Sequence, residues 1–373
     1  MLPIFVTFFI RTCDIDCYRK LTAGEGERYP LGMRVKAPRP DSSPSAHITH
    51  AAVGQPTPDA PIPSRARSRR LADGYLVAAD APLTVRAYTA DWTHFSLWCA
   101  SREVVPIPAS PTLVGDYLSD LGEGYARSTL RRKVAAIARA NRHAGHPLDT
   151  RHPSIRDVLR GIGRTHGSPP KRAQALATEE VQRLVATCDE GLVGVRDRAL
   201  LLVAFAGALR RSELCGIEVE HLTWRPRSLE LLIPRSKTDA EGDGARIGIP
   251  RGKVENTCPV RALRAWLDAA GIEHGPVFRA VTRHNTLRSA ALSGEAVRLV
   301  VLKRARLAGI KGSRLEPISP HGLRAGFVTA AYRARIPDEE IMGHSRHRSL
   351  TTMRSYVRRS KLSHASPAGK VGL

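Results

Sequence analysis

Acidic residues are scarce in this chain: 35 Asp and Glu stand against 58 Lys and Arg among 373 residues, a net charge of +23. The sequence offers no carboxylate cluster of the kind that holds Mg²⁺. It also contains no G-x-x-x-x-G-K-[ST] loop, which would cradle a nucleotide phosphate. Neither metal-assisted phosphoryl transfer nor P-loop nucleotide hydrolysis is therefore expected.

Cysteines and long apolar runs are scarce too. The six cysteines follow no disulfide or zinc spacing, so we expect reduced thiols. The apolar run over residues 2–10 is too short to span a bilayer, and no basic residue precedes it as in a signal peptide. We expect a soluble cytoplasmic protein with no membrane partner.

The excess of arginine is the main feature that is present. Guanidinium groups form paired hydrogen bonds with phosphate oxygens, so the charge balance predicts a polyanionic partner, DNA or RNA. A ribosomal-type RNA binder and a generic arginine-rich protein are the alternatives on charge alone. If DNA is the partner, the bound protein would lie on the nucleoid.

Composition divides the chain into segments. Residues 1–75 are rich in Pro, Ser and Ala and include the basic run 65–70, which predicts a disordered basic arm. Translation from Met33 is an alternative. Residues 80–165 show helical periodicity and predict a small helical domain, with Thr84 and Ser128 as N-caps of its first and third helices.

The third of these helices is basic. Its cationic residues are predicted to contact the DNA backbone, although a solvated surface is the simpler alternative. They are Arg131, Arg132, Lys133, Arg139 and Arg142.

Residues 166–175 contain Gly, Ser and a Pro pair and predict a linker. Residues 176–362 then predict a second domain, followed by a tail over 363–373. This domain is expected to be mostly helical with one small sheet, a hairpin of 228–234 and 246–250. The predicted fold class is thus mainly α with a small β-sheet.

Four strings of the second domain carry residues suited to phosphate chemistry. They are GALRRSEL (207–214), PRSKTD (234–239), SPHGLR (319–324) and HRSLTTMRSY (347–356). Preorganised donors aimed at the non-bridging oxygens are the main way to stabilise the transition state of phosphodiester cleavage. Such a set followed by a tyrosine predicts metal-free cutting and rejoining of a DNA strand.

Each residue also has an ordinary structural interpretation. Arg210 follows a helix break, and Glu213 shares its face and could orient it or form a plain surface pair. His321 and Arg324 are three residues apart at a helix start, for which Ser319 is the predicted N-cap.

Lys237 follows a strand in the hairpin loop and is a candidate general acid, although surface lysines are common there. Tyr356 lies on a helix that Ser349 is predicted to cap, where a tyrosine usually packs. As a nucleophile its phenol needs a base or cationic neighbours. His344 and His347 could form a metal pair, but no third ligand is evident nearby, so we expect no metal and no cofactor.

In these four strings and their order the chain resembles the tyrosine recombinase, or phage integrase, family over about residues 82–360. The resemblance places the family's catalytic residues on Arg210, Lys237, His321, Arg324, His347 and Tyr356. His347 is chosen over His344 because the family's closing motif sets the histidine nine residues before the tyrosine. Ala208 and Arg346 stand where the family usually has glycine.

The resemblance implies site-specific recombination through a 3′-phosphotyrosine intermediate, used for integration, excision or resolution of DNA. It implies Tyr356 as the nucleophile, Lys237 as the general acid, and His321 as a candidate proton acceptor. It also implies a C-shaped clamp formed by a core-binding domain and a catalytic domain around double-stranded DNA. Four copies would assemble on synapsed DNA, with accessory or directionality proteins as further partners.

Two alternatives remain open. A type IB topoisomerase or a telomere-resolving strand transferase would use similar residues. A DNA-binding accessory protein that has lost catalysis would not require Tyr356 or Lys237.

Overall fold

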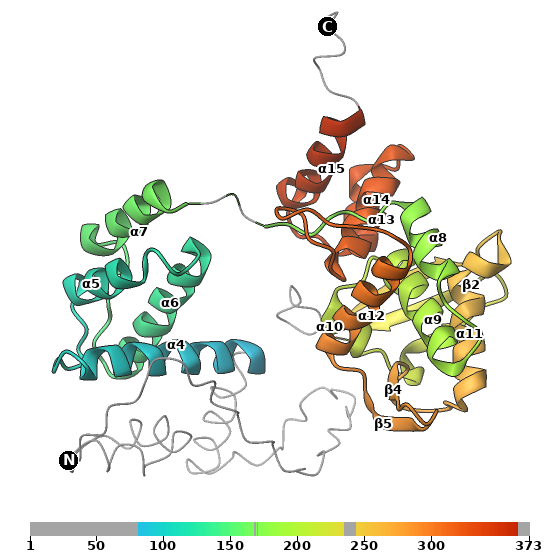
Figure 1. Cartoon of the computed structure of the whole chain (residues 1–373), viewed down its shortest axis with the longest axis horizontal. Helices are drawn as coiled ribbons and strands as arrows, with labels where there is room; N and C mark the ends of the chain where they lie inside the picture. Colours follow the sequence, from blue (N-terminus) through green and yellow to red (C-terminus); the bar gives the residue numbers. More distant parts are fainter. Residues whose placement is uncertain (1–80, 168, 170, 235–243, 365–373) are drawn as a thin grey trace, which may run out of the picture. The chain divides into compact units, whose positions relative to one another are not determined.

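The computed structural model describes residues 81–167, 169, 171–234 and 244–364, the stretch 358–364 by its backbone alone. The predicted arm over residues 1–75, most of the predicted tail and Lys237 lie outside the described residues. The chain divides after residue 168 into two compact units, each with its own hydrophobic core. Both units are mainly helical, in agreement with the predicted fold class (Figure 1).

The described part of the N-terminal unit consists of α4 (Pro82–Ala100), α5 (Pro111–Leu121), α6 (Arg127–His143) and α7 (Pro153–Thr165). Proline begins three of these helices, a position where its missing N–H is not needed. Apolar residues at helical spacing point inward and form one core. It includes Phe95, Tyr117, Leu118, Leu130, Ile137 and Ile155.

Two predicted caps in this unit are wrong. Helix α4 begins at Pro82 with Ala81 as N-cap, so Thr84 lies inside its first turn. Helix α6 begins at Arg127, one residue before Ser128, and has no side-chain cap. In both cases the backbone enters the helix earlier than the first residue with a capping side chain.

The C-terminal unit is built around one buried helix. Its described helices are α8 (Thr178–Ala186), α9 (Leu192–Ala206), α10 (Arg211–Cys215), α11 (Pro259–Ala270), α12 (Gly294–Leu307), α13 (His321–Arg333), α14 (Asp338–Ser345) and α15 (Leu350–His364). Short 3₁₀ turns lie at Val219–His221 and Glu255–Thr257. Helix α9 is apolar on nearly every side, as expected of a helix that others cover. Trp266 of α11 is fully buried, and its indole N–H donates to the Val277 carbonyl at 2.8 Å.

The predicted hairpin is confirmed. Strands β2 (Ser228–Ile233) and β3 (Ala245–Pro250) pair antiparallel, with Leu231 opposite Ile247 on the buried face. A third strand, β1 (Leu222–Trp224), pairs with β2. The expectation of a single sheet is wrong, because β4 (Arg279–Val281) and β5 (Leu287–Ala291) form a second, two-stranded sheet. Most of β5 is exposed, so its sequence carries little alternation of apolar and polar residues.

A buried ion-pair cluster joins α9 to α12. Asp197 accepts hydrogen bonds from Arg304 Nε at 2.9 Å and from Arg196 Nη2 at 2.7 Å. All three side chains are almost fully buried, so removal of Asp197 would leave two uncompensated cations in the core.

The end of the predicted linker belongs to the C-terminal unit. The backbone N–H of Arg172 donates to the Leu315 carbonyl, and that of Leu176 donates to the Gly322 carbonyl. Helix α13 lies so close to this segment that a Cβ on Gly326 would collide with the Leu176 carbonyl. Glycine at this position lets α13, which carries His321 and Arg324, approach the segment closely.

Candidate active site

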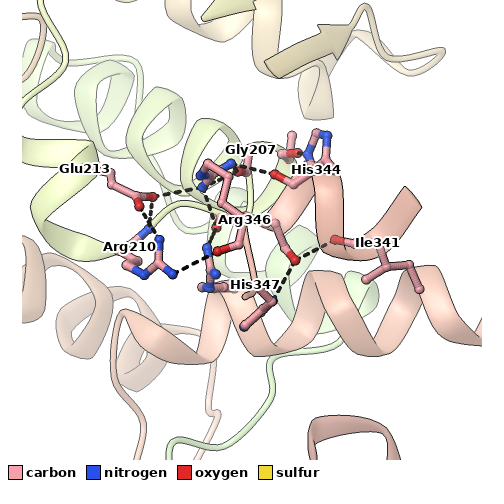
Figure 2. A network of polar contacts seen from close by, with 11 residues as sticks. Gly207, Arg210, Glu213, Ile341, His344, Arg346 and His347 are labelled. Atoms are coloured by element: carbon pink, nitrogen blue, oxygen red, sulfur yellow. Dashed lines mark hydrogen bonds and ion pairs between the residues drawn. The ribbon is translucent and has the colours of Figure 1, made fainter. Parts of the chain in front are cut away.

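Arg210 lies at the junction between two helices. Helix α9 ends at Ala206 with Gly207 as its C-cap, and Ala208 turns the backbone with a φ of 45°. Arg210 is then the N-cap residue of α10. Its Nη1 donates to Glu213 Oε1 at 2.6 Å, and its backbone N–H donates to Glu213 Oε2 at 2.8 Å. The buried carboxylate of Glu213 therefore holds both the backbone and the guanidinium of Arg210 (Figure 2).

Arg324 is buried, with only 1% of its surface exposed. Its Nη1 donates to the Ala208 carbonyl at 2.6 Å, while Nη2 has no hydrogen-bond partner among the described residues. Burial, together with the positive charges of Arg210 and Arg346, lowers the pKa of Arg324 to about 9. A buried cation with an unused donor is a group that an anion would stabilise.

Tyr356 on α15 faces His321 at the start of α13. Its phenol oxygen and His321 Nε2 are 2.7 Å apart, within hydrogen-bonding distance. Met353 and Val357 on the same helix are buried and hold α15 against α13. The Ser349 hydroxyl accepts from the Thr352 N–H at 3.3 Å, which confirms the predicted cap. The phenol thus lies beside a group that can take its proton.

The predicted cap of α13 is wrong in detail. Pro320, not Ser319, is its N-cap residue, and no side chain caps the helix. The N–H groups of Gly322 and Leu323 donate to the carbonyls of Ser319 and Pro320. These two N–H groups are thus already bonded, and side chains supply the donors of this site instead.

His347 also lies next to Tyr356, with ring centroids 5.8 Å apart. The Ser345 hydroxyl donates to the Ile341 carbonyl at 2.5 Å, and His347 Nδ1 lies 2.6 Å from the same hydroxyl oxygen. A carbonyl can only accept, so the single hydroxyl proton is committed to it and Nδ1 must be the donor. Burial and the charges of Arg324 and Arg210 lower the pKa of His347 to about 3, so the ring is neutral at pH 7.

His344 is directed elsewhere. Its ring stacks on Phe327 with centroids 4.8 Å apart, and its Nε2 lies 2.8 Å from the Ala206 carbonyl. The structure thus brings His347, and not His344, to the tyrosine. No group of three potential metal ligands occurs among the described residues.

No role was predicted for Arg346 from the sequence, in which it was noted only as an arginine at a position where the family usually has glycine. Its Nη2 donates to Glu213 Oε2 at 2.9 Å, on the opposite oxygen from Arg210 Nη1. Three arginines and one glutamate therefore lie together in the site, which leaves an excess of positive charge. Figure 2 shows Arg346 between the Gly207 turn and Glu213.

The basic residues of α6 do not share one environment. Arg131 and Arg142 are exposed, Arg139 is half-buried, and the guanidinium of Arg132 is held by Asp91 at 2.7 Å. Lys133 is 3% exposed; its ammonium pairs with Asp91 at 3.4 Å and lies 5.1 Å from the Tyr125 ring centroid. Lys133 therefore serves the packing of the N-terminal unit, which argues against the predicted DNA contact for this one residue.

Comparison with known proteins gives a consistent picture. The profile of the phage integrase family matches residues 174–362. The integrase/recombinase xerD homolog of Selenomonas ruminantium is 36% identical over 293 residues, which cover 77% of this chain and 84% of that protein. Tyrosine recombinase XerC of Myxococcus xanthus is 24% identical over 288 residues, 74% of this chain and 87% of that protein.

Solved structures match the fold. The site-specific recombinase XerH, bound to a palindromic difH substrate in a post-cleavage complex, gives a TM-score of 0.55 at 16% identity and covers 75% of this chain and 79% of XerH. A lambda integrase (75–356) dimer bound to a COC′ core site gives 0.52 at 15% identity, covering 78% of this chain and 94% of that one. No described helix is long and apolar enough to cross a membrane.

Proposed function

Because this chain belongs to the phage integrase family of tyrosine recombinases, enzymes that break and rejoin DNA, we propose that it does so through Tyr356. The phenol oxygen attacks the scissile phosphorus, a 3′-phosphotyrosine bond forms, and the bond to the 5′-oxygen breaks. The 5′-hydroxyl of a second strand then attacks the phosphotyrosine and releases the enzyme. The phosphotyrosine conserves the bond energy, so rejoining needs no ATP.

One observation carries this proposal: the hydrogen-bonding distance between Tyr356 and His321, 2.7 Å, beside a buried arginine with an unused donor. His321 accepts the phenol proton as the oxygen attacks. Arg210 and Arg324 hold the non-bridging oxygens, and each such donor is typically worth about 10²–10³ in rate. The leaving 5′-oxygen takes a proton from Lys237.

His347 must gain a proton before it can donate a hydrogen bond to a phosphate oxygen. With Nδ1 donating to Ser345, the neutral ring presents Nε2 as an acceptor toward its surroundings. It becomes a donor to a phosphate oxygen only when it gains a proton, and a bound phosphate favours that cationic form. We therefore propose that His347 is protonated when DNA is bound. It then donates to a phosphate oxygen together with Arg210 and Arg324.

The DNA partner follows from the family and from the charge of +23. Arg131, Arg139 and Arg142 of α6 contact the phosphate backbone, where electrostatic attraction supplies most of the affinity. Two DNA duplexes and four copies of the chain form the active assembly, in which strands are exchanged between partners. Integration, excision or resolution of DNA is the biological outcome, with accessory or directionality proteins selecting among them.

Covalent trapping tests the proposal. The protein is incubated in EDTA with nicked fragments of its host's genomic DNA, denatured, and examined for protein-linked DNA. We expect linked DNA that shares a junction sequence, and we expect none from Tyr356→Phe. Equal recovery from Tyr356→Phe would contradict the assigned nucleophile. Relaxation of a supercoiled plasmid that lacks the junction would instead favour a topoisomerase.

A further inference from the structure

Arg346 adopts a backbone conformation that its residue type disfavours. It is the C-cap of α14, with φ 58° and ψ 44°, in the left-handed region where glycine is the usual residue. A side chain there is strained, because its Cβ comes too close to the following carbonyl oxygen. Such strain persists where surrounding contacts compensate for it, and it concentrates at functional sites.

The compensating contacts come from the guanidinium of Arg346, and the side chain of this residue is 8% exposed. Nη1 donates to the His344 carbonyl at 2.6 Å and to the Gly207 carbonyl at 3.3 Å. Nη2 donates to the Ala208 carbonyl at 3.1 Å and to Glu213 Oε2 at 2.9 Å. Arg346 therefore connects the end of α14 to the turn after α9 and to α10 (Figure 2).

The acceptors of Arg346 are the groups that hold the two catalytic arginines. Glu213 accepts from both Arg346 and Arg210, and the Ala208 carbonyl accepts from both Arg346 and Arg324. In addition, Arg210 Nη2 donates to the backbone carbonyl of Arg346 at 3.1 Å. Arg346 thus shares the Glu213 carboxylate with Arg210 and the Ala208 carbonyl with Arg324, and its own carbonyl accepts from Arg210.

We propose that Arg346 is a positioning residue that fixes Arg210 and Arg324 in the orientation needed to bind the scissile phosphate. This rests on the proposed function of the same site. Glycine would relieve the backbone strain at position 346 but could not supply the fork. Arginine at this position therefore keeps the backbone strained, but its guanidinium helps to hold those of Arg210 and Arg324 in place.

Electrostatics supports this role. Arg346 is one of the charges that lower the pKa of the Arg324 guanidinium, and it helps to hold the pKa of Glu213 low against the opposing effect of burial. Loss of Arg346 would leave Arg210 as the main cationic partner of Glu213. The pKa of both Glu213 and Arg324 would rise, and the carboxylate would be freer to move with Arg210.

The test compares Arg346→Gly and Arg346→Lys with the wild type on the DNA junction recovered by covalent trapping. Single-turnover cleavage and DNA dissociation constants are measured separately. We expect Arg346→Gly to cleave about 10- to 100-fold more slowly, since small misplacements of catalytic groups cost that much. DNA affinity should change by less than about threefold, because few phosphates are affected. Added guanidinium ion, compared with sodium at equal ionic strength, should restore part of the rate.

Arg335→Gly is the matched control. Arg335 also has a left-handed backbone, with φ 61°, but its side chain is exposed. The substitution removes the same charge and relieves the same strain, so cleavage should stay at the wild-type rate without any effect of guanidinium. Wild-type cleavage by Arg346→Gly would overturn the proposal. If that variant fails to fold, wild-type cleavage by Arg346→Lys, which keeps the charge but loses the fork, would overturn it equally.

A readout without DNA separates this proposal from the proposed function. If the wild type forms no covalent adduct, the proposed function fails. Binding of inorganic phosphate, followed through the arginine Nε–H signals of ¹⁵N-labelled protein, still tests the role of Arg346. We expect Arg346→Gly to weaken phosphate binding at least fivefold and to shift the Arg210 and Arg324 signals before phosphate is added. Unchanged affinity and unchanged signals would overturn the proposal.

Discussion

At the scale of single residues, the buried carboxylate of Glu213 is the centre of the site. It accepts from the Arg210 guanidinium on Oε1 and from the Arg346 guanidinium on Oε2, and its side chain is 1% exposed. The Coulomb attraction between these groups is strong because the carboxylate is shielded from water. The positions of Arg210 and Arg346 therefore depend on the single carboxylate of Glu213.

Replacement of Glu213 by Gln should destabilise the protein. The arginines would remain buried without a counter-charge, and removal of one partner from such a cluster typically costs about 3–5 kcal/mol. Urea unfolding at pH 7 measures the loss. The folded-state pKa of Glu213 lies below its usual 4.5, so its ionisation stabilises the fold above that pH and this contribution is lost on acidification. The difference between wild type and Glu213→Gln should accordingly shrink below pH 4.5, and a constant difference would contradict this assignment.

Ser345 controls the tautomer of His347. Its fully buried hydroxyl donates to Ile341 and accepts from His347 Nδ1. Ser345→Ala should release Nδ1 and slow cleavage by about fivefold, equivalent to about 1 kcal/mol for one side-chain hydrogen bond. Histidine ¹⁵N chemical shifts in the free protein would report the tautomer. A variant that keeps the Nδ1–H form and the wild-type rate would show that Ser345 has no such role.

The residues that the structure brings together could be picked out from sequence because the order of the motif strings is distinctive, whereas Lys237 lies outside the described residues. The surroundings of these residues could not be predicted. The position of His344 against Phe327 and Ala206, and the sharing of Glu213 by two arginines, depend on how α9, α13 and α14 pack. Arg346 is an example. From sequence, an arginine at a position where glycine is usual indicates only a strained backbone, and its role becomes visible only when its hydrogen-bond partners are known.

At the scale of elements, helix α6 combines a buried and an exposed basic surface. Asp91 of α4 binds Arg132 and Lys133, and this joins the two helices. Arg131 and Arg142 remain exposed. From sequence, all five basic residues of this helix were predicted to contact DNA, because periodicity alone does not reveal a carboxylate that faces the helix from a segment about forty residues earlier.

Two substitutions on α6 should separate these roles. Arg131→Gln should weaken DNA binding and reduce the slope of log K against log salt by about 0.9, the value for one phosphate contact. Lys133→Met should leave that slope unchanged and instead lower stability, because Asp91 loses one of its partners. Anisotropy titrations over a salt series, with urea unfolding in parallel, measure both. The reverse pattern would restore Lys133 as a DNA contact.

Elements with strong periodicity were predictable, and weak ones were not. The β2–β3 hairpin stands out because burial of one sheet face leaves a clear alternation of apolar and polar residues. Strands β4 and β5 leave almost none, since they form a small, largely exposed sheet. Helix starts were misplaced where Ala81 and Ala126, not a capping side chain, precede the first turn.

At the scale of the whole molecule, chain segments far apart in sequence meet at one site. The turn after α9, the start of α13, the end of α14 and helix α15 together supply the cations, the histidines and the phenol. The order of the motifs in the sequence could identify these strings but not their contacts. The position of α13, for example, depends on its close approach to the segment ending at Leu176. The fold therefore brings the residues of separate motifs together in one positively charged site.

The most direct test of this account is to locate the DNA on the protein. The trapped complex is trimmed with nuclease, digested with protease and analysed by mass spectrometry for a tyrosine that carries a nucleotide remnant. The chain has eight tyrosines, so the assignment is not trivial. We predict the remnant on Tyr356, attached through a 3′-phosphate. A remnant on any other tyrosine, or a 5′-phosphate linkage, would contradict the account.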